Sequence, residues 1–96
     1  MPLIKYKGKE PSIDKTAWVS PDATLIGDVT VGPNSVIWPG SILRAEMASI
    51  VIGQYSTIFD GVMMVTRSDK GSIHIGNYNI IETGTAIFGT FFEDYV

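Results

Sequence analysis

The chain offers few side chains for acid–base, nucleophilic or metal chemistry. It contains one histidine, His74, and no cysteine, so thiolate metal sites and disulfide bonds are excluded. A histidine can act as a general base near neutral pH. His74 stands between Ile73 and Ile75, and strand alternation would point it away from an apolar interior. Two interpretations follow, a general base in a cleft or a surface histidine. We favour the second, because no nucleophile motif or paired carboxylate accompanies it.

The composition describes a small acidic chain rich in strand-forming residues. Its 96 residues carry seven Lys and Arg against ten Asp and Glu, a net charge of −3. This balance argues against nucleic acid as a partner, because a phosphate backbone is bound by a basic surface. No apolar run is long enough for a signal peptide or a membrane span. The sequence therefore predicts a cytoplasmic protein with no membrane partner.

An aliphatic residue recurs every six positions along the chain. A mostly small residue follows four positions after each of the first six, ending with Met47. The series breaks at residues 44–49 and again at residues 66–72. Its members are Ile13, Val19, Leu25, Val31, Ile37 and Leu43, then Ile52, Ile58 and Met64, then Ile75, Ile81 and Ile87.

A period of six fits neither a helix nor an ordinary strand, and indicates a repeat architecture. Each six-residue unit can form one flat side of a parallel β-solenoid, with the aliphatic residue inside and turn-prone residues at the corners. Three units make a coil, so about five coils are expected. We predict one all-β domain over residues 1–96. It would consist of an N-terminal arm over residues 1–12 and coils over residues 13–96, with loops near residues 44–51 and 66–72. The spacing does not determine the handedness.

Four segments carry a family resemblance: residues 25–32 (LIGDVTVG), 35–46 (SVIWPGSILRAE), 50–53 (IVIG) and 58–61 (IFDG). They resemble the γ-class carbonic anhydrases, members of the hexapeptide-repeat superfamily. The resemblance covers nearly the whole chain. It implies a left-handed parallel β-helix that assembles as a trimer.

The resemblance also bears on the C-terminus. Family members continue for further coils and end in a helix, which this chain lacks. The repeat is still running at Ile87, and residues 91–96 look like the start of another unit. An open solenoid end exposes its core and unpaired backbone groups. We therefore expect either a fragment of a longer chain or an end that another subunit covers.

In the family that this chain resembles, three histidines from neighbouring subunits bind the metal. The matching positions here are Val65, Thr83 and Phe88. Valine and phenylalanine have no lone pair for a metal, and threonine is a poor zinc ligand. The resemblance therefore implies a degenerate metal site, and we predict no metal and no other cofactor.

Three charged residues match polar positions of the same family site. Arg44 and Asp60 stand where the family has an arginine and an aspartate that pair near the subunit boundary, and Glu46 replaces an aspartate. These residues could line a pocket for a small anionic ligand at the subunit interface. Alternatively, Arg44 and Asp60 form a partly buried ion pair that fixes the register between subunits. We favour the ion pair.

Three functions follow from these observations. The favoured one is a γ-carbonic-anhydrase-like protein without a functional metal centre, serving as a structural or small-ligand-binding subunit of a homotrimer. An active γ-type carbonic anhydrase is the first alternative, which the three lost histidines oppose. A hexapeptide-repeat acyltransferase that uses a CoA thioester is the second, with His74 as its available base. Whether the chain is an enzyme stays open, and the three positions without histidine argue against enzyme activity.

Overall fold

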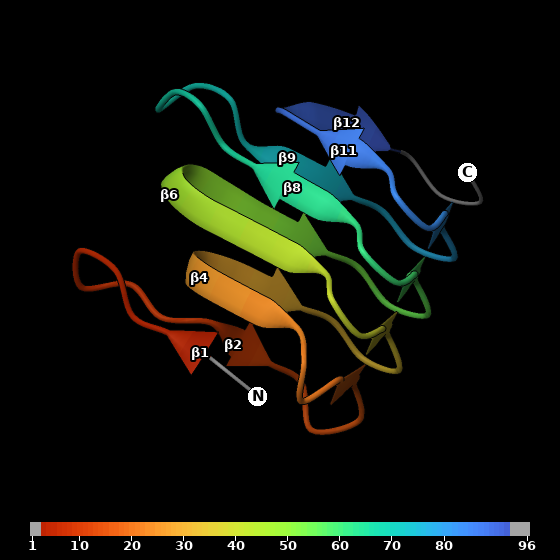
Figure 1. The fold of residues 1–96 in the computed structure, drawn as a ribbon. Helices are drawn as coiled ribbons and strands as arrows, with labels where there is room; N and C mark the ends of the chain where they lie inside the picture. Colours follow the sequence, from red (N-terminus) through yellow and green to blue (C-terminus); the bar gives the residue numbers. More distant parts are fainter. Residues whose placement is uncertain (1–2, 93–96) are drawn as a thin grey trace.

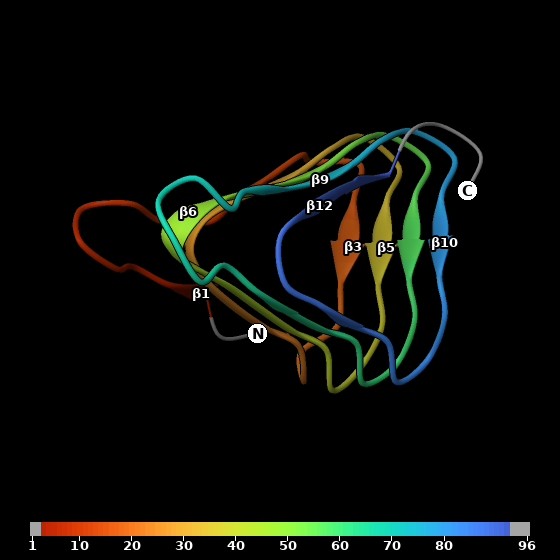
Figure 2. The ribbon, with the colours of Figure 1, turned by 90° about the horizontal axis from the view of Figure 1, so that it is seen from above.

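The chain winds into a parallel β-solenoid with a triangular cross-section. The protein is represented by a computed structural model that describes residues 3–92. Over this range all strands are short or bent, and none of the described residues forms a helix able to span a membrane. Figure 1 shows the turns stacked on one another, and Figure 2 shows the three sides from above. The fold is all-β and matches a left-handed parallel β-helix, as predicted.

Two sides of the triangle form one eight-stranded sheet, and the third is a four-stranded sheet. The two sides are joined because β4 and β6 run around the corner between them. All pairings between these strands are parallel. The first side holds β1 (Leu3–Ile4), β8 (Met63–Val65), β11 (Ala86–Ile87) and the first halves of β4 (Thr24–Val31) and β6 (Ile42–Ile52). The second side holds β2 (Ser12–Ile13), β9 (Ile73–Ile75), β12 (Thr90–Phe92) and the second halves of β4 and β6. The third side holds β3 (Trp18–Val19), β5 (Val36–Ile37), β7 (Thr57–Ile58) and β10 (Ile80–Ile81).

The core consists of the aliphatic residues with period six. Eleven of the twelve are buried, and Ile13 is partly buried against them. The small residues that follow them fill the tight corners. Ser35 and Ser41 are fully buried, and each hydroxyl donates to the carbonyl of a residue on the next turn, Gly53 and Phe59 respectively. Burial of apolar side chains and pairing of the corner hydroxyls both favour a stack of equal turns.

The described chain makes about four full turns and begins a fifth, where about five coils are expected from the sequence. The third side has one strand for each of the four full turns, whereas each of the other two sides has five strands. β1, β2 and β3 make the first full turn, and β11 and β12 belong to an incomplete fifth turn. Residues 93–96, which form the end of the predicted further unit, lie outside the described residues.

The break in the repeat at residues 44–49 is a bend in β6 and not a loop. Residues 44–51, predicted as a loop, lie within this strand. Ala45 pairs with Gly27 and Ile50 pairs with Val29, so two steps along β4 correspond to five steps along β6. The added residues widen the corner. We call residues 45–49 the β6 bend.

Two excursions leave the solenoid at this same corner, as Figure 2 shows. One is the predicted loop at residues 66–72. The other is the N-terminal segment between β1 and β2, where Tyr6 and Lys9 form an antiparallel bridge. Within the predicted arm, Leu3–Ile4 pairs with β4 and so already belongs to the sheet.

Candidate functional site

Arg44, Val65 and Phe88 form a column on the outer surface of the first side. Arg44 pairs in register with Val65, and Phe88 directly follows the pair Ile87–Met64, which places it beside Val65. Neighbouring parallel strands lie about 4.8 Å apart, so each residue is close to the next. Val65 is half-buried and Phe88 is 47% exposed. The register thus brings together two of the three positions that the family resemblance matches to metal ligands.

Thr83 and Asp60 lie elsewhere, in turns at the corner between the third and first sides. Both residues are exposed. The amide of Gly84 donates to the carbonyl of Asp60 at 3.2 Å, so the two turns stack directly on each other. Within one chain, this corner is separated from the Val65–Phe88 column. A second copy would be needed to unite all three positions.

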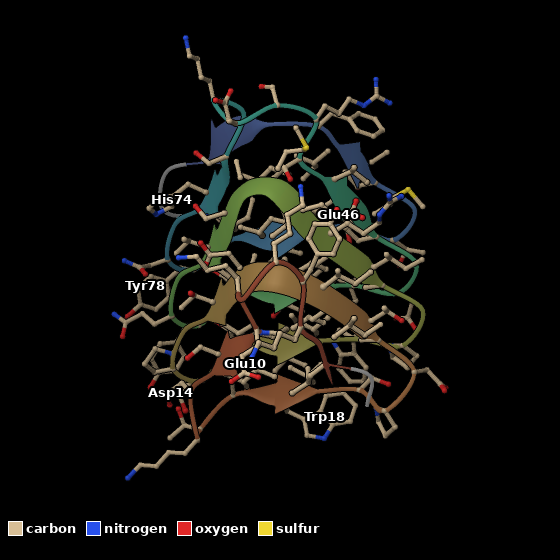
Figure 3. All side chains as sticks on the ribbon, turned by 90° about the vertical axis from the view of Figure 1, so that its left-hand side faces the viewer. Glu10, Asp14, Trp18, Glu46, His74 and Tyr78 are labelled. Carbon is tan, nitrogen blue, oxygen red and sulfur yellow. The ribbon has the colours of Figure 1, made fainter. Side chains whose placement is uncertain are left out.

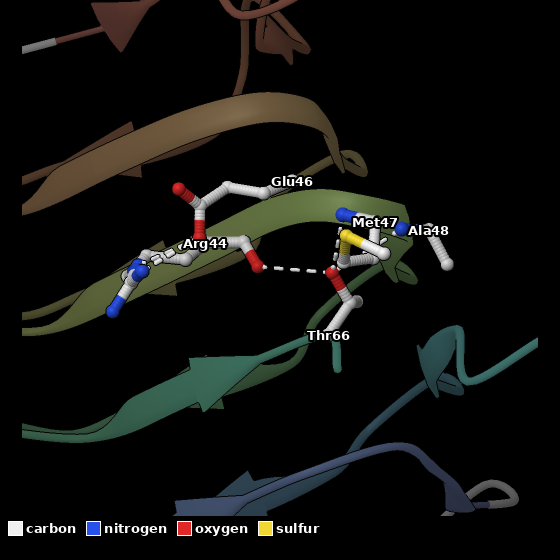
Figure 4. Close-up of polar contacts among 5 residues, drawn as sticks. All are labelled: Arg44, Glu46, Met47, Ala48 and Thr66. Carbon is white, nitrogen blue, oxygen red and sulfur yellow. Dashed lines mark hydrogen bonds and ion pairs between the residues drawn. The ribbon is translucent and has the colours of Figure 1, made fainter. Parts of the chain in front are cut away.

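Arg44 makes its ion pair with Glu46 and not with Asp60. Its Nε and Nη2 both donate to Glu46 Oε1, at 3.0 and 2.7 Å, as Figure 4 shows. Residues two apart on a strand share a face, which brings these side chains together. Asp60 has no ion pair among residues 3–92, so its predicted pairing with Arg44 is not formed within a single chain.

Thr66 holds the β6 bend from the neighbouring turn. Its hydroxyl oxygen accepts hydrogen bonds from the amides of Met47 and Ala48, at 3.0 and 3.2 Å, and it donates to the carbonyl of Arg44 at 3.3 Å (Figure 4). The Thr66 side chain is buried. One side chain therefore satisfies two backbone donors that the bend removes from the sheet ladder.

A cation lies against the Val65–Phe88 column. The Arg67 guanidinium carbon is 4.1 Å from the centroid of the Phe88 ring, a cation–π contact. Arg67 is the second residue of the loop at residues 66–72, and this contact ties the loop to the end of β11. The outer surface here combines a hydrocarbon side chain, an aromatic ring and a positive charge.

Comparisons with known proteins agree with this architecture. The family model described as bacterial transferase hexapeptide (six repeats) matches residues 10–45. The chain is 35% identical to gamma carbonic anhydrase 1, mitochondrial, of Arabidopsis thaliana, over 96% of its own length and 35% of that protein. It is 36% identical to a probable carbonic anhydrase of Methanocaldococcus jannaschii, over 88% of its length and 52% of that protein. The chain is a γ-carbonic-anhydrase-like hexapeptide-repeat protein.

Solved structures support the fold of this γ-carbonic-anhydrase-like chain. A hexapeptide transferase family protein from Anaplasma phagocytophilum superimposes with a TM-score of 0.70 at 22% identity, covering 96% of this chain and 78% of that one. At this identity the likeness concerns the fold alone. The chain spans about a third to a half of the two curated relatives named above.

The residues that the family resemblance matches to metal ligands do not fit a metal ion. Val65 and Phe88 offer only hydrocarbon, and the Arg67 guanidinium beside Phe88 would repel a cation. Across the described part of the chain, no group of three or more His, Cys, Asp or Glu side chains could hold a metal ion.

His74 is remote from this column. Its neighbours Ile73 and Ile75 are fully buried while His74 is exposed, so the alternation predicted from the sequence is confirmed. β9 pairs with the second half of β6, whereas Arg44 and Glu46 lie in or beside its first half. Figure 3 shows His74 and Glu46 on opposite flanks of the solenoid.

Sequence reasoning missed two residues of this region, Thr66 and Arg67. Both lie in the second break of the repeat, where the period gives no information on side-chain direction. A signal was present for the Arg44–Glu46 pair, because opposite charges two residues apart in a strand share a face. No comparable signal links Arg67 to Phe88, which are 21 residues apart.

Proposed function

We propose that this chain is a γ-carbonic-anhydrase-like subunit without a catalytic metal, with a structural or small-anion-binding role in a homotrimer. The observation that carries the proposal is the Val65–Phe88 column with the Arg67 guanidinium 4.1 Å from the Phe88 ring. Zinc-hydroxide chemistry needs three protein ligands and an open position for water. A hydrocarbon pair beside a fixed positive charge supplies none of these.

The separation of the site residues supports a trimer. Val65 and Arg44 lie on the first side, while Thr83 and Asp60 lie at a corner. If one subunit packs this corner against the first side of the next, the two groups meet. Arg44 uses Nε and Nη2 for Glu46, which leaves Nη1 without a partner among residues 3–92. Nη1 is therefore available to Asp60 of a neighbouring subunit, as the register hypothesis requires.

A small anion is the ligand that suits such an interface. Arg44 and Arg67 both lie on or beside the column, and a guanidinium presents a planar set of donors to a carboxylate or a similar anion. Glu46 neutralises part of the Arg44 charge, which favours a weakly bound monovalent anion.

A cytoplasmic location stays a prediction, and the Arabidopsis thaliana relative named above is described as mitochondrial.

The proposal is tested by CO₂ hydration measured in a stopped-flow instrument with a pH indicator. The 96-residue chain is assayed after dialysis against zinc, and again after dialysis against a chelator. We expect rates equal to the buffer background in both samples, because no residue of the column can hold a metal-bound hydroxide. A rate that rises with zinc and disappears with the chelator would instead establish the first alternative, an active carbonic anhydrase.

An acyltransferase is the second candidate, favoured by the family model that matches residues 10–45. Its base would be His74, which is exposed on β9. Titration of acetyl-CoA against the protein, with His74→Ala as the comparison, separates the candidates. Saturable binding together with thioester cleavage that His74→Ala abolishes would favour the transferase. We expect neither from a chain whose one histidine has no nucleophile motif in its sequence.

A further inference from the structure

A hollow of about 150 Å³ lies between the N-terminal segment and the β6 bend. Tyr6, Lys7 and Lys9 reach it from the N-terminal segment. Asp28 reaches it from β4, and Glu46 and Met47 reach it from the bend. All these residues belong to one chain, so the hollow exists without a second subunit. It is separate from the Val65–Phe88 column, although Glu46 borders both regions.

Backbone contacts fix the walls of this hollow. Tyr6 and Lys9 exchange two hydrogen bonds, of 2.8 and 3.0 Å between amide nitrogen and carbonyl oxygen, which closes the N-terminal segment into a tight turn. Thr66 holds the β6 bend from the opposite direction, through the amides of Met47 and Ala48. The two walls are thus set independently, and the hollow needs little rearrangement to accept a ligand.

The lining carries equal numbers of positive and negative side chains. Most of these groups make no hydrogen bond or ion pair with other residues of the described chain. The lining includes two lysines, Lys7 and Lys9, and two acidic residues, Asp28 and Glu46. Glu46 Oε1 accepts both bonds from Arg44, whereas Oε2 accepts none from residues 3–92. Asp28 and Lys9 have no side-chain hydrogen bond within the same range, and Lys7 lies 5.4 Å from the Tyr6 ring centroid. Met47 and Tyr6 add an apolar wall.

We propose that this hollow binds a small amino carboxylate. A purely anionic ligand would meet the carboxylates of Asp28 and Glu46, and a purely cationic ligand would meet Lys7 and Lys9. A ligand that carries both charges can pair with each set, and a short hydrocarbon link can lie against Met47. A cavity of about 150 Å³ holds a molecule of roughly six heavy atoms. The size therefore fits an amino acid with little or no side chain.

Three compounds of equal carbon number test the proposal: β-alanine, propionate and propylamine. Each is titrated into the ¹⁵N-labelled 96-residue protein, and amide shifts are followed at Tyr6, Ala45 and Met47. We expect saturable shifts with β-alanine. The affinities for propionate and for propylamine should be lower than the affinity for β-alanine by about tenfold or more, because each compound lacks one charge-assisted contact. Equal binding of propionate and β-alanine would overturn the proposal in favour of a plain anion site, and the absence of saturable shifts would overturn it altogether.

Two variants with matched controls locate the binding. Lys9→Met and Asp28→Asn each remove one charge from the lining, and each should weaken β-alanine about tenfold. Lys5→Met and Asp22→Asn remove the same charges from positions outside the lining and should leave the affinity unchanged. The Asp28→Asn result stands even if Lys9→Met disturbs the N-terminal turn. Equal affinities for Asp28→Asn and Asp22→Asn would place the ligand elsewhere and contradict the proposal.

Discussion

At the scale of single residues, hydrogen bonds and charge contacts to a neighbouring turn organise the region around the β6 bend. Arg44 and Glu46 are paired by strand alternation, which the sequence alone could have suggested. Thr66 and Arg67 act across turns, on the bend and on Phe88 respectively. Such contacts depend on how the break at residues 66–72 returns to the solenoid. Local sequence does not contain that information, because the period is lost in the break.

Thr66 gives the clearest prediction at this scale. Thr66→Val keeps the shape of the side chain but leaves the amides of Met47 and Ala48 without their acceptor. We expect the free energy of unfolding to fall by about 2 kcal/mol, since buried donors without a partner are costly. Urea denaturation measures it. Thr57→Val is the control, because Thr57 makes no side-chain hydrogen bond within residues 3–92. Equal losses for the two variants would show that the Thr66 network does not stabilise the bend.

At the scale of elements, the corner where β4 and β6 bend determines where the excursions emerge. Gly27 sits at this corner with a φ of +81°, beside the point where β4 and β6 lose register. A Cβ on Gly27 would collide with the carbonyl oxygen of Ala45. Both the left-handed backbone and the close approach of the two strands therefore require glycine. Tyr6, which lines the hollow, lies close to the same point, with its Cβ 3.7 Å from the position of a Cβ on Gly27.

Gly27→Ala should be much more destabilising than Gly61→Ala. Gly61 also has a positive φ, +67°, but no atom lies within 4 Å of the position of a Cβ. The left-handed conformation alone costs about 1 kcal/mol for alanine, and we expect that loss for Gly61→Ala. The collision at Gly27 should add about 2 kcal/mol. Thermal and urea unfolding of both variants measure the difference, and similar losses would mean that β4 and β6 can separate without cost.

At the scale of the whole molecule, the sequence predicted the fold well and the site less well. The aliphatic residues with period six form the core because each turn repeats the same burial. Met47, at the end of the series of small residues, is 52% exposed, since the β6 bend ends the regular spacing there. The hollow could not be predicted, because Lys9 and Glu46 line it together only when the N-terminal segment folds back on the bend. Contacts between subunits stay predictions.

The trimer is the principal prediction for the assembly. Sedimentation velocity at micromolar concentration should give a species of three chains. Asp60→Arg should dissociate it, because the new charge would face Arg44 of the neighbouring subunit. Asp69→Arg, in the loop at residues 66–72, is the control and should sediment as the unchanged protein does. A stable monomer of the unchanged protein, or equal behaviour of the two variants, would contradict an interface through Asp60.

The metal content of the purified protein tests the central claim most directly. The 96-residue chain is dialysed against zinc and then against buffer, and bound zinc is measured by mass spectrometry. The triple variant Val65→His, Thr83→His, Phe88→His is treated in the same way. We predict much less than one zinc per chain in the unchanged protein, and an increase toward one zinc per chain in the variant, since three imidazoles in a trimer supply a zinc site. One zinc per unchanged chain, removable by a chelator, would contradict the account.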